Sequence, residues 1–202
     1  VVYAFVIMLA AFAAGSMFQA NQATAQLASV LGVDGMAKTF IGIGIAILVG
    51  IVIIGGLKGI AKVTEKVVPS MAGLYILMCV IVIGANIDQL GDAFSLIIDG
   101  AFSPKAAYGG FLGVLVLGFQ RAAFSNEAGL GSASIAHSAA KTKHPVSEGF
   151  VALLEPFIDT VVVCTLTALV LIFTGTYEGQ EATGSALTAV AFGKVIPGAS
   201  IF

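Results

Sequence analysis

Five long apolar segments follow one another along the sequence, at about residues 1–31, 40–57, 67–87, 108–136 and 150–175. Three of them are close to the ~20 residues that an α-helix needs to cross the hydrocarbon core of a bilayer. Isolated strands would leave backbone N–H and C=O groups unpaired in lipid, so segments that span a membrane must be helices. We therefore predict an all-α polytopic membrane protein with about five transmembrane helices in a single domain, followed by an external loop element at 176–202.

The composition agrees with placement in lipid. Apolar residues make up 58% of the chain and charged residues only 10%, whereas soluble domains carry about 25% charged residues. The net charge is −2 and the basic residues form no stripe, so no nucleic-acid partner is expected.

The sequence carries no recognised catalytic or metal-binding motif. It lacks an H-E-x-x-H, a Cys or His cluster, a G-x-x-x-x-G-K and a nucleophile elbow. His137 and His144 fall in a predicted loop and are interpreted as solvated side chains. We therefore expect no enzyme, and assign neither catalytic residues nor a metal site.

The charges in the loops orient the segments. The loops at 58–66 and 137–148 hold five lysines against two glutamates, whereas the other loops carry mostly carboxylates. By the positive-inside rule, the lysine-rich loops are cytoplasmic. The sequence therefore predicts a multi-pass protein surrounded by membrane lipid.

Amide side chains recur at helical spacing in the first segment. Gln19, Gln22 and Gln26 stand at i, i+3 and i+7, and so share one face of a helix. Such a stripe either forms hydrogen bonds between helices or lines a polar cavity, and both interpretations stay open. Under the second, Gln19 is the candidate substrate-binding residue because it lies nearest the middle of the span.

The fourth segment is interrupted by a polar run that follows Gln120. Serine, asparagine and glycine are weak formers of helix interiors, and Gly129 and Gly131 allow the backbone to leave helical geometry. This pattern is typical of a discontinuous transmembrane helix, whose unwound carbonyls and helix ends bind a cation and a small zwitterion. A kinked helix with paired charges is the alternative.

Four charged residues lie inside the apolar segments, where a charge is costly unless it is paired, hydrated or functional. Arg121 and Glu127 belong to the fourth segment, and Glu155 and Asp159 lie one turn apart on the fifth. We predict that they form an intramembrane charge network in which at least one carboxylate pairs with Arg121.

Several motifs together resemble those of the alanine or glycine:cation symporters, and the resemblance covers nearly the whole chain. The most specific is the ten-residue run Phe124-Ser125-Asn126-Glu127-Ala128-Gly129-Leu130-Gly131-Ser132-Ala133 after Arg121. The others are Phe157–Thr160 with Cys164-Thr165, Gly55-Gly56 with Val67–Pro69, and Ala101–Pro104 with Gly109-Gly110.

This resemblance implies part of a leucine-transporter-type fold of two inverted five-helix repeats, with the five segments as core helices three to seven. It implies a prokaryotic cell-membrane transporter that couples sodium or proton influx to uptake of alanine or glycine by alternating access. Substrate contacts would come from Gln19, Phe124, Ser125, Asn126 and Gly129.

The resemblance also implies that the chain is the middle of a longer protein. Core helices one and two would precede Val1, and the principal site for the coupling ion Na⁺ would lie outside these residues. A channel or structural membrane subunit, in which the polar residues serve only helix packing, remains the alternative function. The sequence predicts no oligomeric state.

Overall fold

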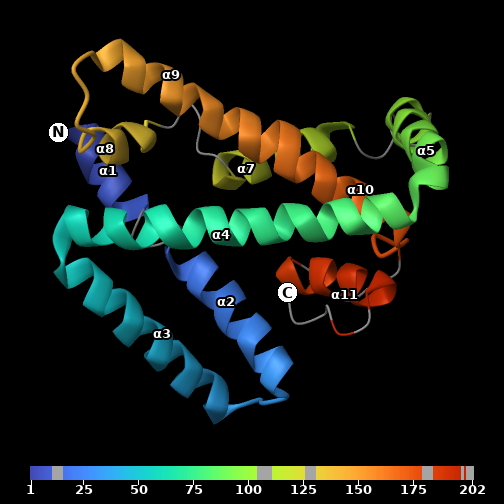
Figure 1. Ribbon diagram of the computed structural model, residues 1–202, viewed down its shortest axis with the longest axis horizontal. Coiled ribbons are helices and arrows are strands. Elements are labelled where there is room, and N and C mark those ends of the chain that lie inside the picture. Colours follow the sequence, from blue (N-terminus) through green and yellow to red (C-terminus); the bar gives the residue numbers. More distant parts are fainter. Residues whose placement is uncertain (11–15, 104–110, 126–130, 179–183, 197, 199–202) are drawn as a thin grey trace. The chain divides into compact units, whose positions relative to one another are not determined.

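The computed structural model describes residues 1–10, 16–103, 111–125, 131–178, 184–196 and 198. The elements that it describes are helices, with no strand among these residues (Figure 1). In chain order they are α1 (Val2–Ala10), α2 (Ser16–Leu31), α3 (Met36–Ile54), α4 (Gly56–Ala85), η2 (Ile87–Gln89), α5 (Leu90–Phe102), α7 (Phe111–Ser125), α8 (Ala133–His137), α9 (Pro145–Pro156), η3 (Phe157–Cys164), α10 (Thr165–Phe173) and α11 (Ser185–Val195).

Three helical stretches in the described part of the chain are long and apolar enough to cross a membrane. They cover Met36–Ile54, Gly56–Ala85 and Pro145–Phe173, and each contains an 18-residue window with a mean hydropathy of 2.5, 2.3 and 2.2, respectively. Their apolar side chains are largely exposed; Leu48, for example, is 66% exposed and Ile51 64%. Exposure of so much apolar surface to water would be unfavourable by about 25 cal/mol per Å². This surface therefore suits contact with lipid or with further helices, as the sequence predicts for a membrane protein.

Two adjacent glycines join α3 directly to α4. Gly55 caps α3, and a Cβ built on it would lie 3.2 Å from the Cα atom of Gly59. Gly56 has a φ of +64°, a conformation that favours glycine because residues with a Cβ are strained there. The glycine pair thus allows a turn of minimal length between two long helices.

Residues 58–66, which are predicted to be a loop, form the first turns of α4. The 30 residues of α4 span about 45 Å at 1.5 Å per residue, against about 30 Å of hydrocarbon. The lysine-rich end can therefore extend beyond the bilayer while staying helical. Lysine, glutamate and alanine are good helix formers, so charge marks where the chain leaves lipid and not where the helix ends.

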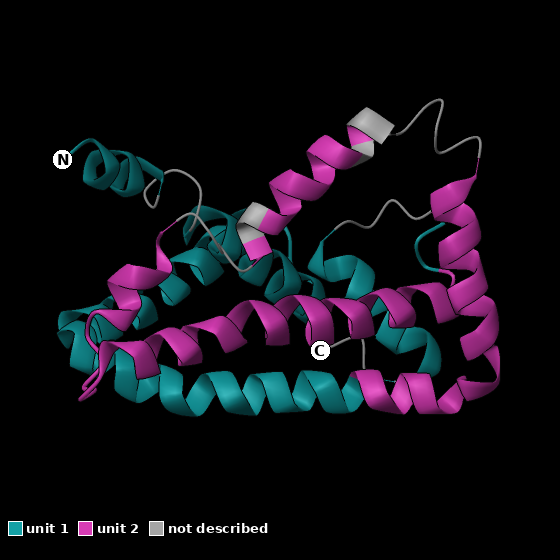
Figure 2. Cartoon of the chain, turned by 90° about the horizontal axis from the view of Figure 1, so that it is seen from above, with its two compact units in different colours: residues 1–78, 176–202 teal, residues 79–175 magenta. Residues whose placement is uncertain are grey.

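The chain divides into two compact units (Figure 2). In the first, residues 1–78 with 176–202, α2 packs against α3 and α11. The rings of Tyr75 on α4 and Phe192 on α11 meet edge to face, with centroids 5.7 Å apart. The predicted segment 1–31 appears as α1 and α2, and residues 11–15 between them lie outside the described residues.

In the second unit, residues 79–175, α9, η3 and α10 continue one another as one helical run (Figure 1). Its middle, Phe157–Cys164, is a π-helix. Pro156 precedes it and has no N–H to donate to the carbonyl of Ala152, so the regular α-helical ladder is interrupted at this point. π-Helical segments inside α-helices occur frequently at functional sites.

Candidate functional site

The fourth predicted segment contains two described helices, α7 and α8. The helix α7 ends at Ser125 and α8 begins at Ala133. Between them, Gly131 has a φ of +88°, which lies outside the helical region. The candidate residues Asn126, Glu127 and Gly129 lie outside the described residues, as does the side chain of Phe124.

The end of α7 contacts the π-helical segment through a polar pair, a hydroxyl and a carboxylate. Oγ of Ser125 donates a hydrogen bond to Oδ2 of Asp159 and lies 3.9 Å from Sγ of Cys164. The structure thus brings together a predicted substrate-binding residue and a member of the predicted charge network.

The π-helix explains how Asp159 and Cys164 reach the same hydroxyl. Neighbours on one face of an α-helix are three or four residues apart, and residues five apart diverge. The i→i+5 hydrogen bonding of a π-helix brings residues five apart onto one face. Asp159 and Cys164 have this separation, so the local geometry of η3 allows both to approach Ser125.

The other members of the predicted charge network are placed differently. Arg121 is exposed on α7, and among the side chains that the structure describes it forms no ion pair with Glu155 or Asp159. Glu155 instead lies near His137, and Asp159 binds Ser125. Glu127, the remaining member of the predicted network, lies outside the described residues.

One amide of the stripe on α2, that of Gln22, forms hydrogen bonds to another helix, α11. Oε1 of Gln22 accepts hydrogen bonds from the backbone N–H of Ser185, at 3.3 Å, and from its hydroxyl, at 3.1 Å. Ser185 is the first residue of α11, so Gln22 satisfies one of the backbone donors that a helix leaves unpaired at its N-terminus. Gln19, in contrast, is exposed on α2.

The absence of a side chain at Gly184 makes space for the side chain of Gln22. Gly184 has a φ of +63°, and a Cβ built on it would lie 2.6 Å from Oε1 of Gln22. A residue with a side chain at 184 would therefore be strained and would displace the amide from Ser185.

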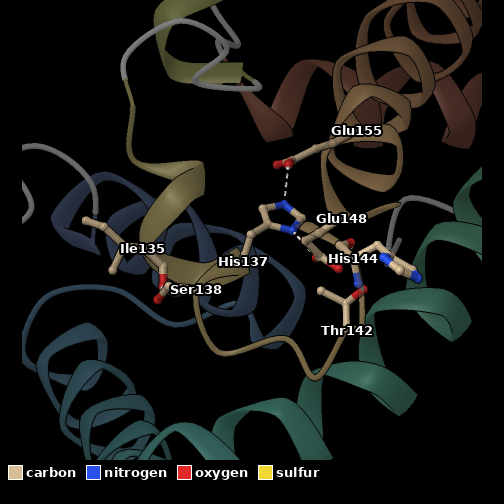
Figure 3. Close-up of polar contacts among 7 residues, drawn as sticks. All are labelled: Ile135, His137, Ser138, Thr142, His144, Glu148 and Glu155. Atoms are coloured by element: carbon tan, nitrogen blue, oxygen red, sulfur yellow. Dashed lines mark hydrogen bonds and ion pairs between the residues drawn. The ribbon is translucent and has the colours of Figure 1, made fainter. Parts of the chain in front are cut away.

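His137, which is predicted to be solvated, is half-buried between two carboxylates. Nδ1 of His137 lies 2.6 Å from Oε1 of Glu148, and Nε2 lies 3.7 Å from Oε2 of Glu155 (Figure 3). The hydrogen bond to Glu148 raises the pKa of His137 above its usual range; partial burial opposes this, and Glu155 adds to it. Glu148 and Glu155 are seven residues apart and so lie on one helix face. This spacing is the feature of the sequence that could have predicted the cluster.

A cavity of about 230 Å³ lies elsewhere in the second unit, where α5 packs against α10. It is lined by Gln89, Asp92, Ala93, Leu96, Ile172 and Phe173. None of the candidate residues lines it. In the described part of the chain, no group of three His, Cys, Asp or Glu side chains is arranged to hold a metal ion.

Comparison with known proteins decides the family. The model of the sodium:alanine symporter family matches residues 1–202. The chain belongs to this family. It is a family of membrane transporters and not of enzymes, so both the resemblance read from the motifs and the expectation of a non-enzyme are confirmed.

Several relatives in the family carry names that specify transport. The chain is 42% identical to the sodium/alanine symporter AgcS of Methanococcus maripaludis over 98% of its own length and 44% of the relative. It is 38% identical to the probable sodium/glutamine symporter GlnT of Bacillus subtilis, over 86% of the chain and 37% of that protein. It is 37% identical to the sodium/proton-dependent alanine carrier protein of Bacillus sp. PS3, over 84% of the chain and 38% of that protein.

The chain spans about two fifths of the length of the curated relatives that it matches. No solved structure matches it.

Proposed function

We propose that this chain forms the central part of a symporter in the cell membrane, which couples sodium influx to uptake of alanine or glycine. The observation that carries the proposal is the family match along the whole chain. The relatives' names agree on a coupling cation and an amino acid substrate, but they differ between alanine and glutamine and between sodium alone and sodium or protons. Alanine or glycine is our proposal for this chain, because the ten-residue run resembles that of the alanine or glycine:cation symporters.

The binding element proposed is the broken segment between α7 and α8, with contacts from Phe124, Ser125, Asn126 and Gly129. The C-terminal end of a helix carries partial negative charge on its unpaired carbonyls. Asp159 places a carboxylate at the same end of α7, where it binds Ser125. This concentration of negative charge favours a cation there, either the ammonium group of the substrate or the coupling ion.

The transport cycle proposed is alternating access in a leucine-transporter-type fold of two inverted repeats. In such folds discontinuous helices bind substrate near the middle of the membrane, and one bundle rocks against the other around the site. The separate helices α7 and α8, with Gly131 in a positive-φ conformation, support this assignment. The oxygen atoms of Ser125 and Asp159 are ligands of the type that hard cations prefer.

Solute counterflow tests the function against its alternative. The full-length protein that contains this chain is reconstituted in vesicles preloaded with unlabelled alanine, and labelled alanine is added outside with sodium on both sides. A symporter accumulates label transiently by exchange. A channel would let the label equilibrate without overshoot, and a structural subunit would show no uptake above protein-free vesicles.

A first prediction concerns topology. Cysteines placed at Lys62 and Lys143 should face the cytoplasm, and one at Asp92 should face outside, because the lysine-rich stretches stay on the cytoplasmic side. An impermeant thiol reagent applied to intact cells should label position 92 and leave 62 and 143 unlabelled until the cells are permeabilised. Labelling at 62 from outside would overturn the orientation.

A second prediction separates the two roles of the α2 amides. Gln19→Ala should raise the KM for alanine or abolish uptake with expression unchanged, because we propose that this exposed amide contacts substrate. Gln22→Ala should instead lower stability by about 1 kcal/mol through loss of the bonds to Ser185, with KM unchanged. Uptake kinetics and thermal unfolding of both variants make the comparison. Equal, small effects of the two substitutions on KM would mean that the whole stripe serves only in helix packing.

A further inference from the structure

The cluster of His137, Glu148 and Glu155 lies outside the proposed binding element but next to it in the chain. His137 is the last residue of α8, the short helix that follows the broken segment, and both glutamates are on α9. Figure 3 shows the imidazole between the two carboxylates, one facing each ring nitrogen. The side chains of His137 and Glu148 are 26% and 24% exposed, and that of Glu155 is 52% exposed.

His137 connects α8 to the rest of the unit. The hydroxyls of Ser134 and Ser138 bond backward to carbonyls of their own segment, at Gly131 and Ile135. The imidazole instead crosses to α9, the helix against which α8 packs. A helix of five residues has little surface to bury, so one cross-helix contact can decide how firmly it is held.

The geometry favours the protonated ring. A neutral imidazole has one N–H donor and one lone pair, so beside two carboxylates it can donate to only one and presents its lone pair to the other. The imidazolium donates from both nitrogens and balances one of the two negative charges. Glu148 and Glu155 are the charged side chains of α9, and the connecting loop adds Lys141, Lys143 and His144. The raised pKa of His137, caused first by Glu148, agrees with this reasoning.

We propose that His137 is a positioning residue operated by a proton: when protonated it holds α8 against α9 through Glu148 and Glu155, and when neutral it releases Glu155. Cytoplasmic pH would then set how firmly the second half of the broken segment is held, and hence how readily it moves during transport. The effect on transport rests on the proposed function, whereas the proton-dependent contact does not.

The direction of the pH dependence follows from the raised pKa in the folded protein. Stabilisation by the contact is complete below the unfolded-state pKa of about 6.5 and is lost as the pH rises through the folded-state value. A firmly held α8 should slow the conformational cycle, so kcat should fall at acidic internal pH while KM changes little.

Thermal unfolding of the purified full-length protein between pH 5.5 and 9 tests the contact without any need for transport. His137→Gln and Glu148→Gln should each lower Tm by about 2 °C at pH 6 and leave it unchanged at pH 9. Glu155→Gln should show a smaller decrease of the same kind. His144→Gln is the matched control, because its exposed ring lies in the same loop region, and its curve should follow the wild type throughout. A Tm decrease that is equal at every pH would reduce His137 to a packing residue and overturn the proposal.

Uptake into vesicles of controlled internal pH tests the consequence. Wild-type kcat should rise severalfold from internal pH 6 to 8, and His137→Gln should remove that rise while its KM stays that of the wild type. A variant that keeps the wild-type pH profile would overturn the regulatory role even if the Tm results hold. Failure of the wild type to transport any amino acid would instead refute the proposed function, and the Tm comparison would still decide the contact.

Discussion

Gly129→Leu should abolish coupled uptake by the full-length protein while the protein still reaches the membrane. A side chain at this position is costly for two reasons. It restricts φ and ψ where the backbone leaves the helix, and its Cβ intrudes where carbonyls approach a ligand. Gly129 lies outside the described residues; α7 is described up to Ser125, and Gly131 beyond it has a φ of +88°. Uptake of labelled alanine, with surface expression measured in parallel, makes the test.

Gly118→Leu is the matched control for that substitution. Gly118 lies within α7, and a Cβ built on it meets no atom within 4 Å, so a side chain there should leave uptake near the wild-type rate. A continuous helix through position 129 predicts the opposite behaviour, since replacing glycine by alanine in a helix interior gains up to about 1 kcal/mol. Gly129→Ala with wild-type uptake and raised thermal stability would therefore refute the discontinuous helix.

Asp159→Ala should reduce kcat/KM for alanine by about 10- to 100-fold, because hydrogen bonds to charged groups contribute roughly 1.5–3 kcal/mol. The substitution removes the acceptor of the Ser125 hydroxyl and the negative charge at the end of α7. Asp159→Asn keeps an acceptor oxygen without the charge, so it separates the two contributions. If the charge attracts the coupling ion, the asparagine variant should need a higher sodium concentration for half-maximal uptake.

Cys164→Ala provides the comparison for Asp159. Its sulfur lies 3.9 Å from the same Ser125 oxygen, a distance at which a thiol interacts weakly, so uptake should change less than twofold. Equal losses in the Asp159 and Cys164 variants would indicate general disruption of η3 and not a specific role for the carboxylate.

The broad features could be predicted from the sequence because they depend on composition along one segment. The apolar runs at 40–57, 67–87 and 150–175 overlap the three stretches that are long enough to span a membrane. The interruption predicted from the polar run after Gln120 stays a prediction, because residues 126–130 lie outside the described residues. The family followed from a ten-residue motif, which needs no knowledge of packing.

Other features depend on contacts between segments or on backbone register, and these could not be predicted. The helix continues through 58–66, where a loop is predicted. The charged residues there mark the end of the membrane-spanning part, but they do not end the helix. The π-helix after Pro156 shifts which residues share a face, so the pairing of Asp159 with Ser125 does not follow from α-helical spacing. The contact of His137 with Glu148 depends on how the intervening loop folds back.

Binding of labelled alanine to the purified full-length protein in sodium tests the central claim, that the broken segment is the binding element. The wild type should bind alanine saturably, with competition by glycine, and replacement of sodium by potassium should abolish binding. Gly129→Leu should show no saturable binding and Asp159→Asn weakened binding, while His137→Gln, placed outside the binding element, should bind as the wild type does. Equal affinity of the wild type and Gly129→Leu for alanine would contradict the account.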